Sequence, residues 1–490
     1  MTYKTGIRRI DHIRHVIALG KDTYSTGKIS YELVEEMCQV LEEFVQIMKS
    51  YKVKDYRAYA TSAMREAHNR QIILDQIRVR TGLTVRIISN SEQRFISYKA
   101  IAAKAAEFNK IIQKGTAIVD VGFGSAQLSL FDKDSLVTTQ NLPLGTLRVR
   151  GLLARIPATV EEHKQHIEEI VDNELFTFRK MYLKDREIKS LIATGESILF
   201  MARSGIRHME SDRVSAEQFK SFYRKLLSMT AEEIEDEFGI DGEYASILVP
   251  SAVIYGRILE MTGAETVWIP GVSLCDGMAA EYTQDRKLVK LRHDFNGDIL
   301  SSARNMAKRY KCHGDHIQEV ERLSAELFDV TKNTMAWEKG TAAPSDCRHS
   351  HDCGKLSAPA ERRRAVIRLS WPRRSSAFPT WNGRLWQRSY YYNQDFAYDA
   401  VKLESDLSQY EGSGLTRRAV TILIAKLTAI LSLASAMDRS QRQKFAGASM
   451  AVRDGKLLIT ASCPETIILE RASFENRAEF LRKFSGFSRC

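Results

Sequence analysis

The feature that most constrains the fold of this chain is an apolar strand that runs into a glycine-containing turn. The stretch from Ala117 to Val119 is followed directly by Asp120-Val-Gly122-Phe-Gly124-Ser125, and a second apolar stretch comes next. An aspartate at the end of a buried strand can orient a metal ion or a water, and glycines let backbone amides approach a phosphate closely. An ordinary tight hairpin turn explains the same residues, so the motif alone leaves both interpretations open.

Predicted strands and helices alternate on both sides of this motif. The hydrophobic periodicity predicts these elements: helix 31–51, strand 56–60, a helix after Ser62, strand 84–88, a helix from Ser91, helix 161–179 and strand 190–193. Such alternation predicts a sheet covered by helices. We therefore expect two α/β domains, 1–113 and 114–290. They are followed by a mainly helical domain, 291–490, which ends in two strands and a helix over 449–484.

Two polar runs in the first domain lie at predicted junctions between a strand and a helix. Thr61 or Ser62 can cap the helix after the strand 56–60, and its amides together with Arg65 form a candidate phosphate site. Glu92 stands at the start of the next helix. The structural alternatives are a capped surface helix with a solvated Arg65 and a first-turn glutamate favoured by the helix dipole. Taken singly, both runs favour these alternatives.

The composition is that of a globular protein without a membrane span or an export signal. Of 490 residues, 44% are hydrophobic and 27% are charged, which suffices for several cores. The most apolar run, 419–437, contains Lys426, and the charged N-terminus lacks a secretory core. Seven scattered cysteines without a Cys-x-x-Cys pair predict reduced thiols. We expect a cytoplasmic protein without a membrane partner.

The net charge of +11 is concentrated in one segment. Residues 340–390 hold ten Lys and Arg against three Asp and Glu, so the remainder of the chain is close to neutral. The segment is also rich in proline and tryptophan and has no helical or strand period. A basic RNA-binding insert and a disordered loop are two interpretations, although no nucleic-acid-binding module pattern occurs and nucleic acid is not the expected partner. Our hypothesis is that a stretch within about 337–389 is translated out of frame.

The order and spacing of the motifs carry more information than any one of them. The runs are Thr61-Ser62-Ala63-x-Arg65-Glu66-Ala67, Ser91-Glu92-Gln93-Arg94, the Asp120 motif, Leu142-Pro143-Leu144-Gly145, the Gly195 turn and Gly271 to Gly277. In this order they resemble the exopolyphosphatase and guanosine pentaphosphate phosphatase family. The resemblance implies an actin-like, ribonuclease H-like α/β phosphatase fold of two lobes with the active site between them. It also implies Mg²⁺, a polyphosphate or guanosine nucleotide substrate, and a homodimer.

The resemblance also implies roles for individual residues. Glu92 would be the general base that activates water, and Asp120 would position the water or Mg²⁺. Residues that would bind the substrate's phosphates are Arg65, Thr61, Ser62, Gly122, Gly124, Ser125 and Gln127.

Departures from the family pattern affect the expected site. Phe123 replaces the middle glycine and Gln127 replaces a glutamate of the family's loop, so one carboxylate that could bind metal is gone. No first phosphate loop of the Asp-x-Gly-Ser type precedes Ile7, so we expect the chain to start inside the first sheet and to lack half of the phosphate site.

The third domain resembles an HD-type helical domain. His316 lies in a helix-like run, and His351-Asp352 matches the His-Asp pair that binds a divalent metal in such domains. A fortuitous dipeptide is the alternative, because the residues before His351 are polar. Asp438 is a further candidate ligand, with a structural role at a helix end as its alternative.

Two functions from different classes follow from these motifs. The first is a hydrolase that releases orthophosphate from polyphosphate or guanosine pentaphosphate. The second is a non-catalytic or decayed protein that retains polyphosphate or nucleotide binding. An actin-fold kinase or ATPase is disfavoured, because such an enzyme also needs the first phosphate loop.

Overall fold

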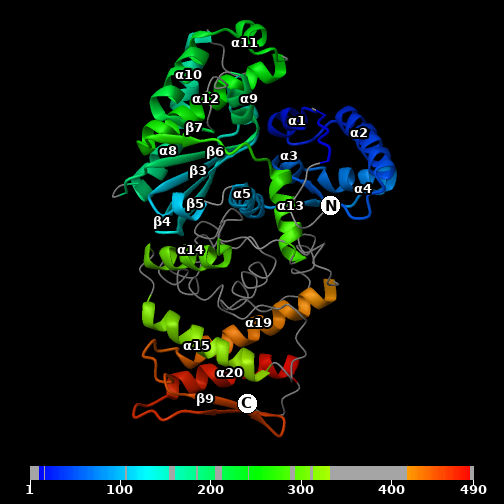
Figure 1. Ribbon diagram of the computed structural model, residues 1–490. Helices are drawn as coiled ribbons and strands as arrows, with labels where there is room; N and C mark the ends of the chain where they lie inside the picture. Colours follow the sequence, from blue (N-terminus) through cyan, green and yellow to red (C-terminus); the bar gives the residue numbers. More distant parts are fainter. Residues whose placement is uncertain are drawn as a thin grey trace. The chain divides into compact units, whose positions relative to one another are not determined.

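The computed structural model divides the chain into two compact units, Met1–Asp294 and Phe295–Cys490. The residues that the structure describes are 10–15, 17–104, 108–153, 160–183, 186–204, 212–240, 242–286, 288, 293–309, 313–331 and 417–485. Figure 1 traces the elements of each unit. No helix among the described residues is both long and apolar enough to cross a membrane.

A six-stranded sheet organises residues 114–290. Its strands lie in the order β5 (Ser135–Leu142), β4 (Ala126–Asp132), β3 (Thr116–Val121), β6 (Ser190–Thr194), β8 (Thr266–Trp268) and β7 (Arg213–Ser215). The first three form an antiparallel meander, whereas β6 and β8 continue the sheet parallel to β3. The mixed α/β prediction is confirmed.

The meander contains one strand more than a simple strand-turn-strand unit. The chain reverses after β4 at Lys133 and Asp134, both of which have positive φ, at 52° and 59°. Two consecutive residues with positive φ form the type I′ turn that suits a two-residue hairpin. The sequence signal is weak because neither residue is glycine or asparagine.

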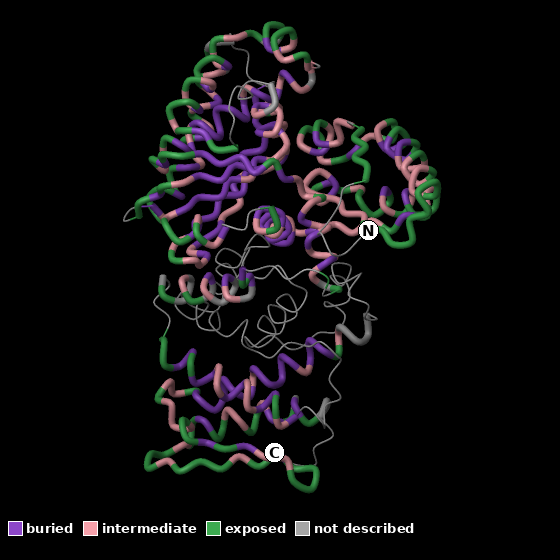
Figure 2. Tube along the Cα trace, viewed as in Figure 1, coloured by how far each residue is buried: buried purple, intermediate pink, exposed green. Residues whose placement is uncertain are grey.

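Helices cover this sheet and bury its two central strands. They are α7 (Thr146–Leu153), α8 (Val160–Phe178), η1 (Arg179–Leu183), α9 (Glu196–Ser204), α10 (Ala216–Ser228), α11 (Ala231–Phe238) and α12 (Gly242–Thr262). Figure 2 shows the strands as a buried layer. Ala117, Val119 and Val121 of β3 point into the apolar core that these helices share. Because strand side chains alternate, Asp120 lies on the opposite face of the sheet.

Residues before 114 form a smaller set of helices around two short strands. The elements are α1 (Leu19–Thr26), α2 (Tyr31–Ser50), β1 (Ala58–Ala60), α3 (Ser62–Glu66), α4 (Arg70–Thr81), β2 (Val85–Ile87), α5 (Asn90–Lys104) and α6 (Phe108–Ile111). β1 and β2 pair in parallel. The predicted helix after Ser62 is two helices, because Ala67 is extended between α3 and α4. α13 (Leu274–Asp285) packs against α5, where Lys99 Nζ pairs with Glu281 at 2.7 Å.

The second unit is a helical layer with a terminal hairpin, as the sequence predicts. Its described elements are α14 (Phe295–Arg309), α15 (Gly314–Thr331), α19 (Arg417–Met437), β9 (Ser449–Arg453), β10 (Lys456–Thr460) and α20 (Ile468–Ser485). α19 packs between α15 and α20. Leu323, Leu327 and Ile430 are buried in this packing. The segment 337–389 of the reading-frame hypothesis lies outside the described residues.

Candidate active site

The turn between β3 and β4 presents a row of backbone donors. We call residues 120–125 the Asp120 loop. The Gly122 amide donates to the Ser125 carbonyl at 3.0 Å and closes the turn. Within the described part of the chain, the next three amides, those of Phe123, Gly124 and Ser125, have no hydrogen-bond acceptor. Consecutive backbone amides without acceptors form a concave site for an anion. The structure therefore favours an anion site over a plain hairpin turn.

Asp120 is the penultimate residue of β3 and lies on the face of the sheet that α5 covers. Its Oδ2 accepts a hydrogen bond from Ser97 Oγ of α5 at 3.0 Å. Burial raises the pKa of the Asp120 carboxyl, while the Ser97 hydrogen bond and the nearby Arg94 charge act in the opposite direction. Ser97 was not a predicted site residue, because nothing in its local pattern distinguishes it.

Arg94 and Gln127 lie beside Asp120 and are both buried. Gln127 is the residue of β4 directly opposite Asp120, and its Oε1 accepts from Arg94 Nε at 3.2 Å. Both terminal nitrogens of the Arg94 guanidinium have no partner among the described residues. Burial lowers the pKa of Arg94, since an apolar environment disfavours its charged form. The Gln127 substitution thus leaves a buried cation facing an amide instead of a carboxylate.

Glu92 is held in a capping box at the start of α5. Its Oε2 accepts from the Ser89 amide at 2.8 Å and from Ser89 Oγ at 3.2 Å, and the Glu92 amide donates back to Ser89 Oγ. Its Oε1 accepts from Arg86 Nη1 at 2.9 Å. The carboxylate is thereby fixed in one orientation. Glu92 and Ser97, the residue that binds Asp120, lie on the same helix. At a rise of about 1.5 Å per residue, they are about 7.5 Å apart along the axis of α5.

Arg65 hydrogen-bonds to the strand-to-helix junction that carries Glu92. Its Nη1 donates to the Ile88 carbonyl at 2.6 Å and its Nη2 donates to Asn90 Oδ1. Burial lowers the pKa of Arg65. The structure therefore brings Arg65 and Glu92 to one end of α5, as the resemblance implies, although the nitrogens of Arg65 already have protein acceptors.

The capping role predicted for Thr61 or Ser62 is wrong. Thr61 occupies the N-cap position of α3, but its side chain makes no capping hydrogen bond. Ser62 Oγ instead accepts a hydrogen bond from the Tyr24 hydroxyl at 3.0 Å. Tyr24 belongs to α1, a helix that the sequence analysis did not predict.

The second unit contains a fully buried histidine-aspartate pair. His316 Nδ1 lies 2.6 Å from Asp438 Oδ2, and both side chains are inaccessible to solvent. Asp438 Oδ1 also accepts from the Gln443 amide at 2.7 Å, which supports the helix-end role for this residue. His351 and Asp352 lie outside the described residues. Among the residues that are described, no group of three or more histidine, cysteine or acidic side chains is arranged to hold a metal.

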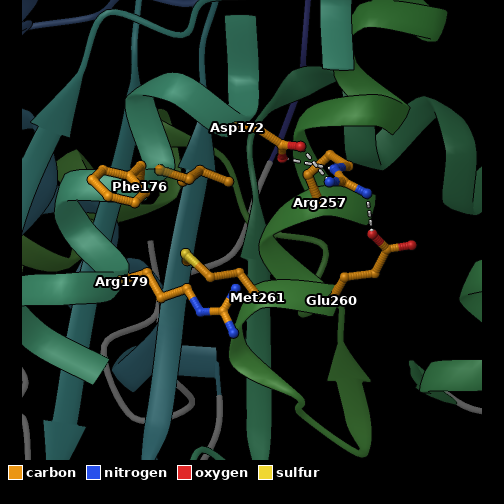
Figure 3. Close-up of a pocket in the computed structure, with 7 residues that line it drawn as sticks. Asp172, Phe176, Arg179, Arg257, Glu260 and Met261 are labelled. Carbon is orange, nitrogen blue, oxygen red and sulfur yellow. Dashed lines mark hydrogen bonds and ion pairs between the residues drawn. The ribbon is translucent and has the colours of Figure 1, made fainter. Parts of the chain in front are cut away.

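A cavity of about 380 Å³ lies on other elements of the first unit (Figure 3). It is lined by residues of α8, η1 and α12, none of which is a predicted site residue. Arg257 on its rim donates to Asp172 at 2.8 Å and to Glu260 at 2.6 Å. Its charge is therefore neutralised within the protein, and the lining of this cavity includes no residue of the Asp120 loop.

Comparison with known proteins places the chain in a family. The Ppx/GppA phosphatase family matches residues 4–285, which is more than half of the chain. The chain therefore belongs to the Ppx/GppA phosphatase family. The match includes the Asp120 loop, α5 with Glu92, and the α3 run with Arg65, and it ends with α13.

Individual relatives are distant. An exopolyphosphatase 1 of Mycobacterium leprae is 24% identical over 266 residues, which cover 52% of this chain and 76% of the relative. A bifunctional 3-dehydroquinate synthase/phosphatase of Fusobacterium nucleatum is 19% identical and covers 51% of this chain, but the match spans only 39% of that relative. A guanosine-5'-triphosphate,3'-diphosphate pyrophosphatase of Vibrio vulnificus is 22% identical, covering 65% of this chain and 61% of the relative.

The close approach of α7 to the Asp120 loop gives a testable prediction. A Cβ on Gly145 would lie 2.2 Å from the Gly124 carbonyl carbon and 2.3 Å from the Phe123 oxygen. We expect Gly145→Ala to lower the free energy of unfolding by about 1–3 kcal/mol, because backbone has to move. Gly151→Ala within α7 is the control, since its Cβ would meet no atom within 4 Å. Urea denaturation measures both, and equal midpoints for the two variants would contradict the prediction.

Proposed function

We propose that this chain is a phosphohydrolase that cleaves the terminal phosphoanhydride bond of polyphosphate or guanosine pentaphosphate and releases orthophosphate. The single observation that carries the proposal is the row of acceptor-less amides at residues 123–125 beside the carboxylate of Asp120. Family membership and the names of the relatives agree with this substrate class.

The proposed reaction is a transfer of the terminal phosphoryl group to water. The water oxygen forms a bond to the terminal phosphorus, and the bridging P–O bond breaks with its electron pair leaving on the shortened chain. Glu92 accepts the proton from the water, as a general base. The amides of residues 123–125 and the guanidinium of Arg65 stabilise the phosphoryl oxygens. Capping and the Arg86 pair keep the Glu92 carboxylate in place during this step.

Mg²⁺ is proposed as the metal of this site. Mg²⁺ is commonly bound by one or two carboxylates together with the phosphates of the substrate. Asp120 provides one carboxylate at the edge of the loop, so the residues fit an ion held jointly with substrate. When bound, Mg²⁺ adds positive charge that offsets the charge on the phosphoryl oxygens.

Replacing Glu92 by glutamine separates hydrolysis from binding. Glutamine can keep the capping box but cannot accept the proton, so we expect kcat for phosphate release from polyphosphate to fall about 10²-fold or more. Binding of polyphosphate stays within about threefold. Glu32→Gln is the matched control, because Glu32 is an exposed first-turn glutamate of α2. Unchanged kcat in Glu92→Gln would rule out Glu92 as the base.

Restoring the family's carboxylate at residue 127 tests the proposed metal. In Gln127→Glu a second carboxylate stands opposite Asp120 on the neighbouring strand. We expect the Mg²⁺ concentration for half-maximal activity to fall on the order of tenfold, because affinity for a divalent ion rises with the number of charged ligands. Gln140→Glu on β5 adds the same charge beside Tyr182 and serves as the control. A response of Gln127→Glu no greater than that of Gln140→Glu would contradict Asp120 as a metal ligand.

The alternative function is binding without catalysis. The observation that favours it is the engagement of Arg65 and Glu92 by neighbouring protein groups. A wild-type chain that binds polyphosphate and releases no orthophosphate with Mg²⁺ would select this alternative. The cytoplasmic location and the homodimer stay predictions.

We also propose that the second unit is an HD-like domain with a divalent metal site. The buried hydrogen bond between His316 and Asp438 supports this, because metal-binding histidines are oriented by such a carboxylate. The remaining ligands would come from His351 and Asp352.

Metal content tests the HD-like site. We expect the purified full chain to bind about one Mn²⁺ more than His316→Gln or Asp438→Asn, as measured by titration calorimetry with plasma emission as a check. His12→Gln, at an exposed position, is the control. Equal metal content in all four proteins would contradict the proposal.

A further inference from the structure

The orientation of the Asp120 loop is set by groups that bind its carbonyl oxygens. The Gly122 carbonyl accepts from the Thr146 amide at 3.2 Å. The Phe123 carbonyl accepts from the Leu147 amide at 3.0 Å and from the Arg148 amide at 3.2 Å. All of these donors belong to the first turn of α7, whose amides have no acceptor within their own helix.

The third carbonyl of the loop is held by a side chain. Arg148 Nε donates to the Gly124 carbonyl at 2.8 Å. In a trans peptide the C=O and the following N–H point in opposite directions. Three carbonyls turned toward α7 therefore direct the amides of Phe123, Gly124 and Ser125 away from it, which is why these amides lack acceptors in the described structure.

Arg148 itself contacts two residues that precede residue 114 in the chain. Its Nη2 donates to Glu66 Oε2 of α3 at 2.6 Å. Its guanidinium carbon lies 4.7 Å from the centre of the Tyr24 ring of α1. The Tyr24 hydroxyl fits against the loop only because Gly124 has no side chain, since a Cβ there would lie 2.0 Å from that oxygen.

We propose that Arg148 is a positioning residue, which orients the Gly124–Ser125 peptide so that the loop amides face a bound phosphate, and which connects that orientation to α1 and α3. The proposal rests on the proposed function, in that the ligand of the loop is taken to be a phosphoryl group. Of the four hydrogen bonds that orient the loop, this is the one made by a side chain, and so the one that a substitution can remove while the backbone donors stay.

Lysine is a stringent substitute at this position. It keeps the positive charge of Arg148 but has a single nitrogen and no planar group. It therefore cannot donate to the Gly124 carbonyl and to Glu66 and at the same time stack on the Tyr24 ring. If Arg148 acted only as a charge near the phosphate, lysine would replace it. If it acts by orienting the peptide, lysine fails much as alanine does.

The test is binding of tripolyphosphate to the full chain with Mg²⁺, measured by calorimetry for wild type, Arg148→Ala and Arg148→Lys. We expect Kd to rise about 10- to 100-fold in both variants, the effect of disrupting one charge-assisted hydrogen bond. Guanidinium ion at millimolar concentration, too low to denature, restores part of the affinity of Arg148→Ala and none of that of Arg148→Lys. Wild-type affinity in Arg148→Lys would overturn the positioning role.

The matched control is Arg150→Ala. Arg150 follows Arg148 on the same helix, and its Nη1 donates to Ser246 Oγ of α12. We expect its Kd to stay within twofold of wild type. Circular dichroism melting is recorded for every variant, and a Kd of Arg148→Ala that matches wild type in the folded protein would also overturn the proposal.

The design separates this proposal from the proposed function. A wild-type chain that binds tripolyphosphate but releases no orthophosphate contradicts hydrolysis and leaves the comparison of Arg148 variants valid. A chain that hydrolyses polyphosphate with the same KM and kcat in all Arg148 variants contradicts the positioning role alone. No tripolyphosphate binding by wild type contradicts both.

Discussion

The hydrogen bonds between the first turn of α7 and the Asp120 loop are the interaction on which the rest of the site depends. A helix start leaves amides without acceptors, and an irregular turn leaves carbonyls without donors. Here each set satisfies the other, and the amides of the turn are the groups left over. Gly145 makes this possible, because any Cβ there would collide with the backbone of the loop. Gly145, the last residue of the run Leu142-Pro143-Leu144-Gly145, is thus a packing requirement of the phosphate site.

α5 is the second element that determines the site, because it carries both Glu92 and the residue that binds Asp120. Glu92 is fixed by Ser89 and Arg86 at its start, and Ser97 reaches Asp120 one and a half turns later. Arg94 lies between them and faces Gln127. Burial lowers the pKa of the Arg94 guanidinium, and the charge of Asp120 acts in the opposite direction. A glutamate at 127 would place a second carboxylate opposite Asp120 and so add a charged ligand for a metal.

Much of the fold and part of the site could be predicted from the sequence. The helix 31–51, the strand 190–193 and the terminal two strands and helix are confirmed, because each has a clear period or a clear boundary. The short strands β7 and β8 were missed. Thr61 was predicted to cap its helix from residue type alone, and no local rule indicates that Tyr24 engages the neighbouring Ser62 instead. Arg148 was missed for the same reason, as its partners are distant in sequence.

The contacts of Arg148 also couple the Asp120 loop to α1 and α3. The pair with Glu66 is partly exposed, and such ion pairs stabilise a fold by only about 0–1 kcal/mol. It is therefore too weak to hold α3 against α7 by itself. The same pair restrains the guanidinium group whose Nε donates to the Gly124 carbonyl. Its effect therefore falls on the orientation of the loop amides more than on stability. By linkage, a phosphate that binds better to the oriented loop strengthens the contact of Arg148 with Glu66 and Tyr24 to the same extent.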